Sequence, residues 1–238
     1  MKVGIIGRTN VGKSTLFKAM TMEDVEIADR PFTTIEPNRG VAYAKITCPD
    51  KEFGLKCNPH NAPCVNGTRY IPFELIDVAG LIKDASKGKG LGNKFLTDAM
   101  EADALIQVID ISGKTNGSGE KTESYDPAED INMVRGELTA WIGGLIQKIR
   151  VKSSEGLAEA MYKELSGLKF RFETIKEGIK KFNVNRPDDL NLGEFIDYLL
   201  DSDKKMIVAC NKMDITEDLE EKLKQLRSRF QYDFVPCS

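Results

Sequence analysis

The stretch VGIIGRTNVGKST, residues 3–15, decides the fold of this chain. It opens with a short apolar run that ends at Gly7, which predicts a buried strand. A helix is expected to follow from Gly12 to Met20. A buried strand that passes through a glycine-containing loop directly into a helix is typical of a parallel α/β sheet.

The loop in this stretch, Gly7 to Ser14, matches the pattern G-x-x-x-x-G-K-[ST] in full. Its glycines let the backbone N–H groups face a phosphate, and the helix N-terminus adds a favourable dipole. Lys13 is expected to reach the β- and γ-phosphates, and the Ser14 hydroxyl to bind Mg²⁺. The residues expected to hold the nucleotide here are Gly7, Asn10, Val11, Gly12, Lys13, Ser14 and Thr15.

Further apolar runs along the chain predict the remaining strands, at 41–47, 70–76, 104–109, 206–209 and 234–235. Helical patterns lie between several of them. This alternation predicts an α/β fold with a mostly parallel central sheet, and the loop from Gly7 to Ser14 makes it a P-loop domain.

The segment from about 126 to 200 interrupts the alternation. Asp126-Pro127-Ala128-Glu129 is a favourable helix start, and apolar residues then recur at helical spacing as far as Ile149. After a turn at 153–156, a second, heptad-like stripe runs from Leu157 to Phe182. We expect an antiparallel, coiled-coil-like helical insertion over 126–203, between a first part of the GTPase domain at 1–125 and a second at 204–238.

The charge of the chain is unevenly distributed. The formal net charge is -3 over 238 residues, yet ten Lys and Arg face five Glu between Lys148 and Arg186. Such a stretch is either an RNA-binding surface or a solvated helical face. Five cysteines, no membrane-length apolar run and no signal peptide favour a reducing, cytoplasmic location. The oligomeric state stays open.

Two further segments have the chemistry expected around a nucleotide. Asp77-Val78-Ala79-Gly80 follows an apolar strand, so Asp77 is placed to hold Mg²⁺ and Gly80 to offer its N–H to the γ-phosphate. Thr33 and Thr34 lie between this motif and the phosphate loop, where a threonine that reaches Mg²⁺ and the γ-phosphate is expected.

Asn211-Lys212-Met213-Asp214 follows another strand and matches the N-K-x-D pattern that reads guanine. The Asp214 carboxylate can accept hydrogen bonds from both the N1–H and the exocyclic amine of guanine. Adenine lacks this donor pair, so the residue favours GTP over ATP. Cys237-Ser238 stands where a loop beside the base is expected, and the chain ends inside that motif.

Together these motifs resemble the Obg-like GTPases, in particular the archaeal form of the YchF branch. The most specific parts are Thr34-Ile35-Glu36-Pro37-Asn38 and the run from Gly90 to Phe95. The resemblance implies a translation-associated nucleotide switch that binds ribosomes or RNA, with Thr34 as a Mg²⁺ ligand. It also implies a C-terminal domain of the TGS type, which this sequence lacks, so we expect a fragment of a longer protein.

Hydrolysis is expected to be slow. Leu81 follows the D-x-x-G motif where Ras-like GTPases carry a water-orienting Gln, and leucine cannot hydrogen-bond water. Catalysis would then depend on Lys13, Thr34 and Gly80. Two alternatives remain: a ribosome- or RNA-binding module gated by nucleotide with negligible turnover alone, and an ATPase, as in other members of the branch.

Two metal questions are also open. Related GTPases with Asn at the position of Asn10 can bind K⁺ there, whereas the alternative is an asparagine that stabilises the loop. Cys48, Cys57, His60 and Cys64 could form a structural zinc site. Their spacing is not a standard zinc pattern, and an ordinary loop rich in Pro and Asn is the alternative.

Overall fold

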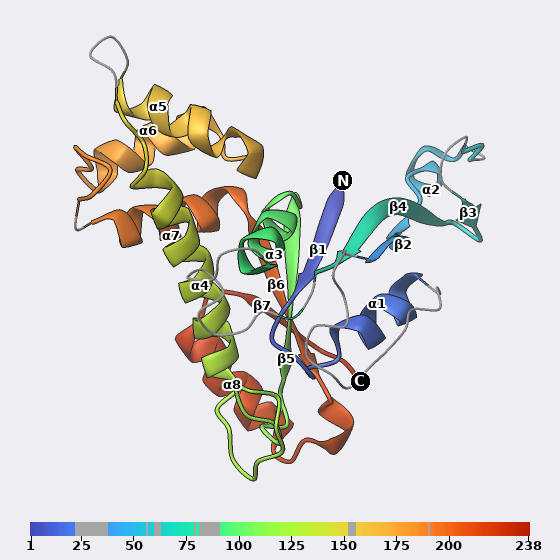
Figure 1. Cartoon of the computed structure of the whole chain (residues 1–238). Helices are drawn as coiled ribbons and strands as arrows, with labels where there is room; N and C mark the ends of the chain where they lie inside the picture. Colours follow the sequence, from blue (N-terminus) through green and yellow to red (C-terminus); the bar gives the residue numbers. More distant parts are fainter. Residues whose placement is uncertain are drawn as a thin grey trace.

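The computed structural model describes residues 1–21, 38–55, 57–59, 63–78, 80, 91–151, 156–189 and 191–238. Its centre is a seven-stranded sheet with the order β2-β4-β1-β5-β6-β7, and β3 pairs with β4 (Figure 1). The strands are β1 (Lys2–Ile6), β2 (Asn38–Thr47), β3 (Cys64–Val65), β4 (Thr68–Asp77), β5 (Ala104–Asp110), β6 (Lys205–Asn211) and β7 (Asp233–Pro236).

The centre of this sheet is parallel. β1 pairs with β4 and β5, and β6 pairs with β5 and β7, all in parallel. Near-continuous apolar runs such as β5 suit these positions because both faces of the sheet are covered. β2 runs antiparallel to β4 at the edge. The predicted α/β fold with a mostly parallel sheet is confirmed.

Helices cover both faces of the sheet (Figure 1). α1 (Lys13–Thr21) packs beside β2 and β4, whereas α3 (Leu91–Met100) and α4 (Ala128–Ile146) pack near β1 and β5 on the other side. The remaining helices are α2 (Asp50–Phe53), α5 (Leu157–Leu165), η2 (Ser166–Leu168), α6 (Phe172–Lys181), α7 (Leu192–Asp203), η3 (Met213–Ile215) and α8 (Leu219–Arg229).

The helices between β5 and β6 differ from the expected two-helix hairpin. α4 begins as predicted, with the Ala128 N–H donating to Asp126 Oδ1 at 2.9 Å. The second predicted helix, over 157–182, is wrong: it breaks into α5, η2 and α6 at Lys169, which has a φ of 61°. The turn buries Phe170 instead of the Phe172 of the predicted stripe. Packing against α4 and α7 therefore overrides the heptad-like spacing.

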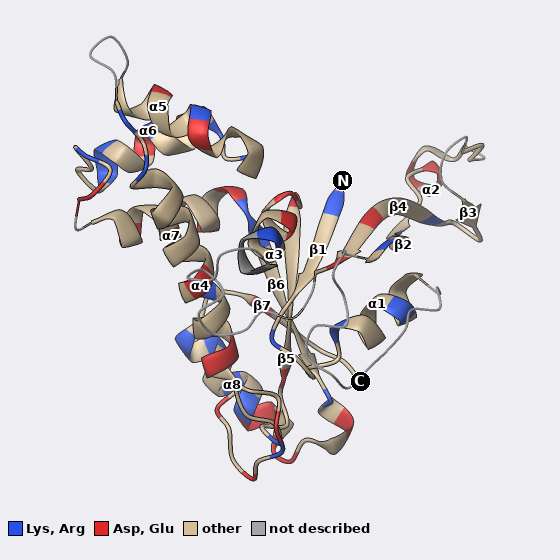
Figure 2. Ribbon diagram, viewed as in Figure 1, with Lys and Arg blue, Asp and Glu red and all other residues tan. Residues whose placement is uncertain are grey.

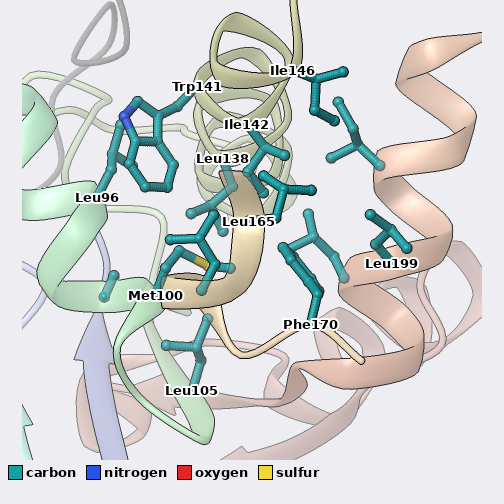
Figure 3. Packing of buried hydrophobic residues seen from close by; sticks show 14 of the residues in the cluster. Leu96, Met100, Leu105, Leu138, Trp141, Ile142, Ile146, Leu165, Phe170 and Leu199 are labelled. Atoms are coloured by element: carbon teal, nitrogen blue, oxygen red, sulfur yellow. The ribbon is translucent and has the colours of Figure 1, made fainter. Parts of the chain in front are cut away.

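A large apolar core joins this helical segment to the sheet (Figure 3). Leu96 and Met100 of α3 face Leu138 and Trp141 of α4, and α5 contributes Leu165. Because one cluster includes α3, β5 and the helices from α4 to α7, the segment packs as a continuation of the α/β core. The division at 126 and 203 remains a prediction. In the described part of the chain, no helix is long and apolar enough to cross a membrane.

Candidate nucleotide-binding site

The phosphate loop between β1 and α1 curls through two glycines that other residues cannot replace. Gly7 has a φ of +146°, and a Cβ there would lie 2.4 Å from the Val108 carbonyl oxygen. Gly12 has a φ of +96°, and a Cβ would lie 2.2 Å from Asn211 Nδ2. Both the backbone conformation and the lack of space require glycine.

Lys13 lies inside this loop with only 8% of its surface exposed. Its Nζ donates a hydrogen bond to the Arg8 carbonyl oxygen at 2.8 Å. Burial lowers the pKa of Lys13 from 10.5 to about 8, although the nearby Asp77 carboxylate acts in the opposite direction. A buried ammonium beside the loop is suited to bind an anion that enters it.

Ser14 and Asp77 meet beside Lys13. The Ser14 hydroxyl donates to Asp77 Oδ2 at 2.7 Å, and Asp77 is 2% exposed. Asp77 Oδ1 is buried and has no hydrogen-bond partner among the described residues. Burial raises the pKa of this carboxyl. A hydroxyl and a buried carboxylate with a spare oxygen fit Mg²⁺, which takes oxygen ligands and retains several waters.

Gly80 completes the phosphate end of the site. A Cβ on this residue would lie 2.8 Å from Thr9 Cγ2 and 3.2 Å from Lys13 Nζ. The D-x-x-G motif therefore brings its glycine backbone against the phosphate loop, and the role of the Gly80 N–H toward a γ-phosphate stays a prediction. A larger residue would push the two apart.

The predicted guanine-reading motif lies at the same edge of the sheet. Asn211 Nδ2 donates to the Val11 carbonyl oxygen at 2.8 Å, which joins the end of β6 to the phosphate loop. Lys212 adopts a φ of 64°, and Asp214 in η3 is exposed. The Met213 N–H donates to the Cys237 carbonyl oxygen at 3.2 Å. The two segments expected to surround the base thus contact each other.

A buried polar network that the sequence did not reveal supports these loops. Arg8 and Asp130 form an ion pair at 2.6 Å, with 0% and 1% of their side chains exposed. Arg8 also donates to the carbonyl and hydroxyl oxygens of Thr115, and the Thr115 hydroxyl donates to Asp110. Asp110 in turn accepts from Lys212 Nζ at 2.8 Å. The network therefore connects the phosphate loop to the Asn211–Asp214 motif.

Electrostatics hold Asp110 charged in this network. Burial acts to raise its pKa, but hydrogen bonds from Lys212, Ser112 and Thr115 leave the pKa below the usual value. One signal in the sequence could have identified it: Asp110 ends a buried strand just as Asp77 does. Parallel strands place such ends at one edge of the sheet. Arg8 occupies a variable position of the loop pattern and gave no signal.

The other predicted site residues are placed as follows. Asn10, with a φ of 62°, donates from Nδ2 to the Gly119 carbonyl oxygen at 3.3 Å, a contact that suits the loop-stabilising alternative. Thr15 and Ser238 are exposed. The predictions for Thr33, Thr34, His60 and Leu81 lie outside the described residues.

A cavity of about 670 Å³ opens beside the phosphate loop, not over Lys13. It lies between Thr9 and α4 and is lined in part by Asn116, Tyr125 and Met133. The cavity therefore borders the site without containing its phosphate-binding groups.

At the far end of the β2–β4 hairpin, away from the nucleotide site, the structure brings together three of the residues predicted to bind zinc. Cys48, Cys57 and Cys64 converge, and Asp50 joins them, with all four ligand atoms within 4.8 Å of one another. Asp50 is not among the residues predicted to bind zinc, because that prediction rested on nitrogen and sulfur ligands.

A family model described as 50S ribosome-binding GTPase matches residues 2–140. The matched segment contains the phosphate loop, Asp77 and Asp110. The chain belongs to this family. Similarity to individual proteins extends beyond residue 140 and covers as much as 99% of the chain.

The relatives of this family member are YchF-type proteins. A GTP-binding protein of Methanocaldococcus jannaschii is 42% identical over 99% of this chain and 62% of its own length. The ribosome-binding ATPase YchF of Escherichia coli O157:H7 is 42% identical over 58% of this chain and 36% of its own length. These matches confirm the resemblance to the YchF branch. The chain spans less than two thirds of each relative.

A solved structure agrees with the fold. The crystal structure of a GTP binding protein from Pyrococcus horikoshii OT3 has a TM-score of 0.79 and 31% sequence identity, covering 100% of this chain and 64% of that chain. The similarity therefore includes the helical segment between β5 and β6 as well as the sheet.

Proposed function

We propose that this family member binds GTP with Mg²⁺, hydrolyses it slowly and acts as a translation- or ribosome-associated nucleotide switch. The observation that carries the proposal is the hydrogen bond from Asn211 Nδ2 to the Val11 carbonyl oxygen at 2.8 Å. This contact joins the Asn211–Asp214 motif to the phosphate loop, which supports the binding of one nucleotide by both.

Specificity for guanine rests on Asp214. Its exposed carboxylate follows the Asn211–Lys212 turn and is free of the buried network behind the loop. Two acceptor oxygens match the two neighbouring donors of guanine, whereas adenine would leave them unmatched. The ATPase name of the Escherichia coli relative makes ATP the competing nucleotide.

Binding of modified bases tests this assignment. In Asp214→Asn, the amide oxygen can still accept from N1–H, and the amide N–H can donate to the carbonyl oxygen that xanthine carries on C2. We expect GTP affinity to fall about 10- to 100-fold, from the loss of a charge-assisted hydrogen bond, and XTP affinity to rise. Glu217→Gln, which removes an exposed carboxylate three residues away, should change neither. Tighter binding of ATP than GTP by the unmodified chain would refute the proposal.

Mg²⁺ is assigned to Ser14 and Asp77, with Thr34 as a further ligand implied by the family resemblance. When bound, the ion would offset the negative charge that develops on the phosphate oxygens. Lys13 and the loop N–H groups would position the phosphates. Leu81 offers no hydrogen bond to an attacking water, which is why slow turnover is proposed.

Turnover measurements separate the enzyme from the nucleotide-gated binding module. Multiple turnovers of GTP without a partner support a slow hydrolase. Negligible turnover that begins when ribosomes are added supports the gated module instead. Measuring GTP turnover in K⁺ and in Na⁺, with and without ribosomes, tests whether Asn10 binds K⁺. Equal turnover rates in the two salts would exclude a catalytic K⁺ at this residue.

Ribosome or RNA binding is assigned to a basic helical surface on α5, α6 and the linkers beside them (Figure 2). We define it by the exposed residues Lys148, Arg150, Lys163, Lys176, Lys180, Lys181 and Arg186. Lys169 and Arg171 are excluded because they pair with Asp103 and Asp203. The family description and the name of the Escherichia coli relative support this partner, which would place the protein in the cytoplasm.

Cosedimentation with 50S subunits tests the basic helical surface. The double variant Lys176→Glu/Lys180→Glu should weaken binding and flatten its dependence on salt concentration, because fewer cations contact phosphates. Lys224→Glu, an exposed lysine of α8, is the matched control and should bind normally. Equal loss of binding in both would refute a localised surface.

A further inference from the structure

The far end of the β2–β4 hairpin contains almost no apolar core. We call residues 48–67, which connect these strands, the hairpin tip. Among its residues whose side chains the structure describes, only Cys48 is buried, and none belongs to the three apolar clusters. Phe53 and Leu55 are each 71% exposed. A loop of this length without a core needs another source of order.

Local hydrogen bonds fold the hairpin tip so that its cysteines converge. The Cys48 N–H donates to the Gly67 carbonyl oxygen at 2.9 Å, which closes the base of the tip. Asn66 and Gly67, with φ values of 51° and 76°, form the tight turn that returns the chain from β3 to β4. The Cys57 N–H donates to Asp50 Oδ2 at 3.1 Å, so the loop after α2 closes back on that helix.

We propose that Cys48, Asp50, Cys57 and Cys64 bind one zinc ion, and that this ion fixes the structure of the hairpin tip. The four ligand atoms lie within 4.8 Å of one another. A tetrahedral zinc with Zn–S bonds of about 2.3 Å separates its sulfur ligands by about 3.8 Å. Side-chain shifts of about 1 Å would therefore close the site.

The ligand set selects zinc among the common metal ions. Thiolates are poor ligands for Mg²⁺ and Ca²⁺ but good ones for Zn²⁺, which also accepts a carboxylate oxygen. The three thiols would release their protons to water on binding. The Arg69 guanidinium donates from Nη2 to Cys57 Sγ at 3.1 Å, which stabilises one thiolate and offsets the negative charge of the ligands.

The position of the ion gives it a role beyond holding the tip. The β2–β4 ladder runs from Thr47↔Thr68, next to Cys48, to Asn38↔Asp77 at the proposed Mg²⁺ site. A slip of one residue would exchange the two faces of β4. Zinc ties Cys48, which directly follows β2, to Cys64 of β3, the strand that pairs with β4, and therefore fixes the register that places Asp77. This second step depends on the proposed function of Asp77, whereas zinc binding does not.

Metal analysis of the purified chain, prepared without chelators, tests the site directly. We expect one zinc per chain, and its loss in Cys57→Ser and Cys64→Ser. Cys210→Ser is the matched control, because Cys210 is buried in β6 and is not in the cluster, so this variant should retain zinc. Absence of zinc together with failure to take up added Zn²⁺ would overturn the proposal, as would a disulfide between two cluster cysteines.

Cobalt substitution keeps the proposal testable if a cysteine variant does not fold. Metal-free protein given Co²⁺ should develop thiolate-to-cobalt absorption, which disappears when Zn²⁺ is added. Asp50→Asn should bind zinc about 10- to 100-fold more weakly in a competition with a chelator. Unchanged affinity in Asp50→Asn, with loss of zinc in His60→Ala, would overturn the assignment of Asp50.

Hydrogen exchange tests the effect on register. Removal of zinc should accelerate amide exchange along β2 and the first half of β4 while β1 and β5 stay protected. Unchanged exchange in β2 would remove the register role but leave the zinc site. Normal zinc content with no nucleotide binding would instead count against the proposed function alone.

Discussion

Asn211 Nδ2 donates a hydrogen bond to the Val11 carbonyl oxygen at 2.8 Å, and the same nitrogen occupies the space that a Cβ on Gly12 would need. The side chain of Asn211 therefore holds the phosphate loop from behind and also requires glycine at position 12. Residues 200 positions apart in the sequence share one small volume.

Removing this contact should weaken the binding of every nucleotide. In Asn211→Ala the loop loses a hydrogen bond and its closest neighbour, so GTP, GDP and XTP should each bind about tenfold more weakly. The equal loss distinguishes this variant from Asp214→Asn, which should change only base preference. Fluorescent nucleotide titration measures both. A loss confined to guanine nucleotides would show that Asn211 acts on the base and not on the loop.

Asp77→Asn should separate metal binding from phosphate binding. The amide keeps the shape of the side chain but lacks the charge that Mg²⁺ requires, so the tightening of GTP binding by Mg²⁺ should disappear. Binding measured in EDTA should change little. Because burial raises the pKa of Asp77, protons should compete with Mg²⁺ at a higher pH than for an ordinary carboxylate.

Isothermal titration of Mg²⁺ into the GTP complex at several pH values measures this competition. The apparent Mg²⁺ affinity should fall as the pH is lowered through the raised pKa of Asp77. Asp233→Asn, a change at an exposed carboxylate of β7, is the control and should leave the profile unchanged. Mg²⁺ affinity that is insensitive to Asp77→Asn would assign the ion elsewhere.

Lys13 should make the stability of the nucleotide-free protein depend on pH. Its pKa is lowered from 10.5 to about 8 by burial, so the unfolded chain binds the proton at higher pH than the folded one. Its stabilising contribution is complete above pH 10.5 and is lost as the pH falls toward 8. Relative to Lys13→Met, the free energy of unfolding should fall by on the order of 3 kcal/mol over this range.

Urea denaturation of the unmodified chain and of Lys13→Met, at several pH values between 8 and 10.5, measures how their free energies of unfolding differ. Lys204, whose pKa is also lowered to about 8, provides a comparison, because Lys204→Met should change the slope and also lose hydrogen bonds to the Met100 and Ala102 carbonyl oxygens. Parallel pH profiles for the unmodified chain and Lys13→Met would contradict the buried position of Lys13.

The buried pair Arg8–Asp130 should be costly to break but not to replace. Arg8→Met leaves the Asp130 carboxylate buried and unpaired, and should lower the free energy of unfolding by about 3–5 kcal/mol. The double variant Arg8→Met/Asp130→Leu removes both charges and should recover much of that loss. Chemical denaturation measures both variants. A double variant no more stable than the single one would show that the pair itself provides the stability.

Local patterns predicted the strands and the loops at their ends. The apolar runs and the motifs around Gly7, Asp77 and Asn211 each lie within a few consecutive residues, and the parallel topology then brings them to one edge. The break at Lys169 was not predicted because Phe170 is buried in a core that it shares with residues of α4 and α7, which the local spacing does not reveal. Regular spacing alone favoured Phe172.

Contacts between residues far apart in the sequence were also not predicted. Arg8 and Asp130 are 122 residues apart, and neither stands in a pattern that names the other. Asp50 lies in the cysteine cluster, where the Cys57 N–H donates a hydrogen bond to its carboxylate. In both places the side chain gains its role only when folding brings distant segments together, and a single sequence does not reveal which segments meet.

The shared core of α3 and α4 has a mechanical consequence. α3 begins 11 residues after Gly80, and its Leu96 and Met100 interlock with Leu138 and Trp141 (Figure 3). Close-packed side chains resist gaps, so a rotation of α3 must carry α4 with it or open a cavity. Movement of α3 is therefore coupled to α4 and, through the same core, to α5 and α7.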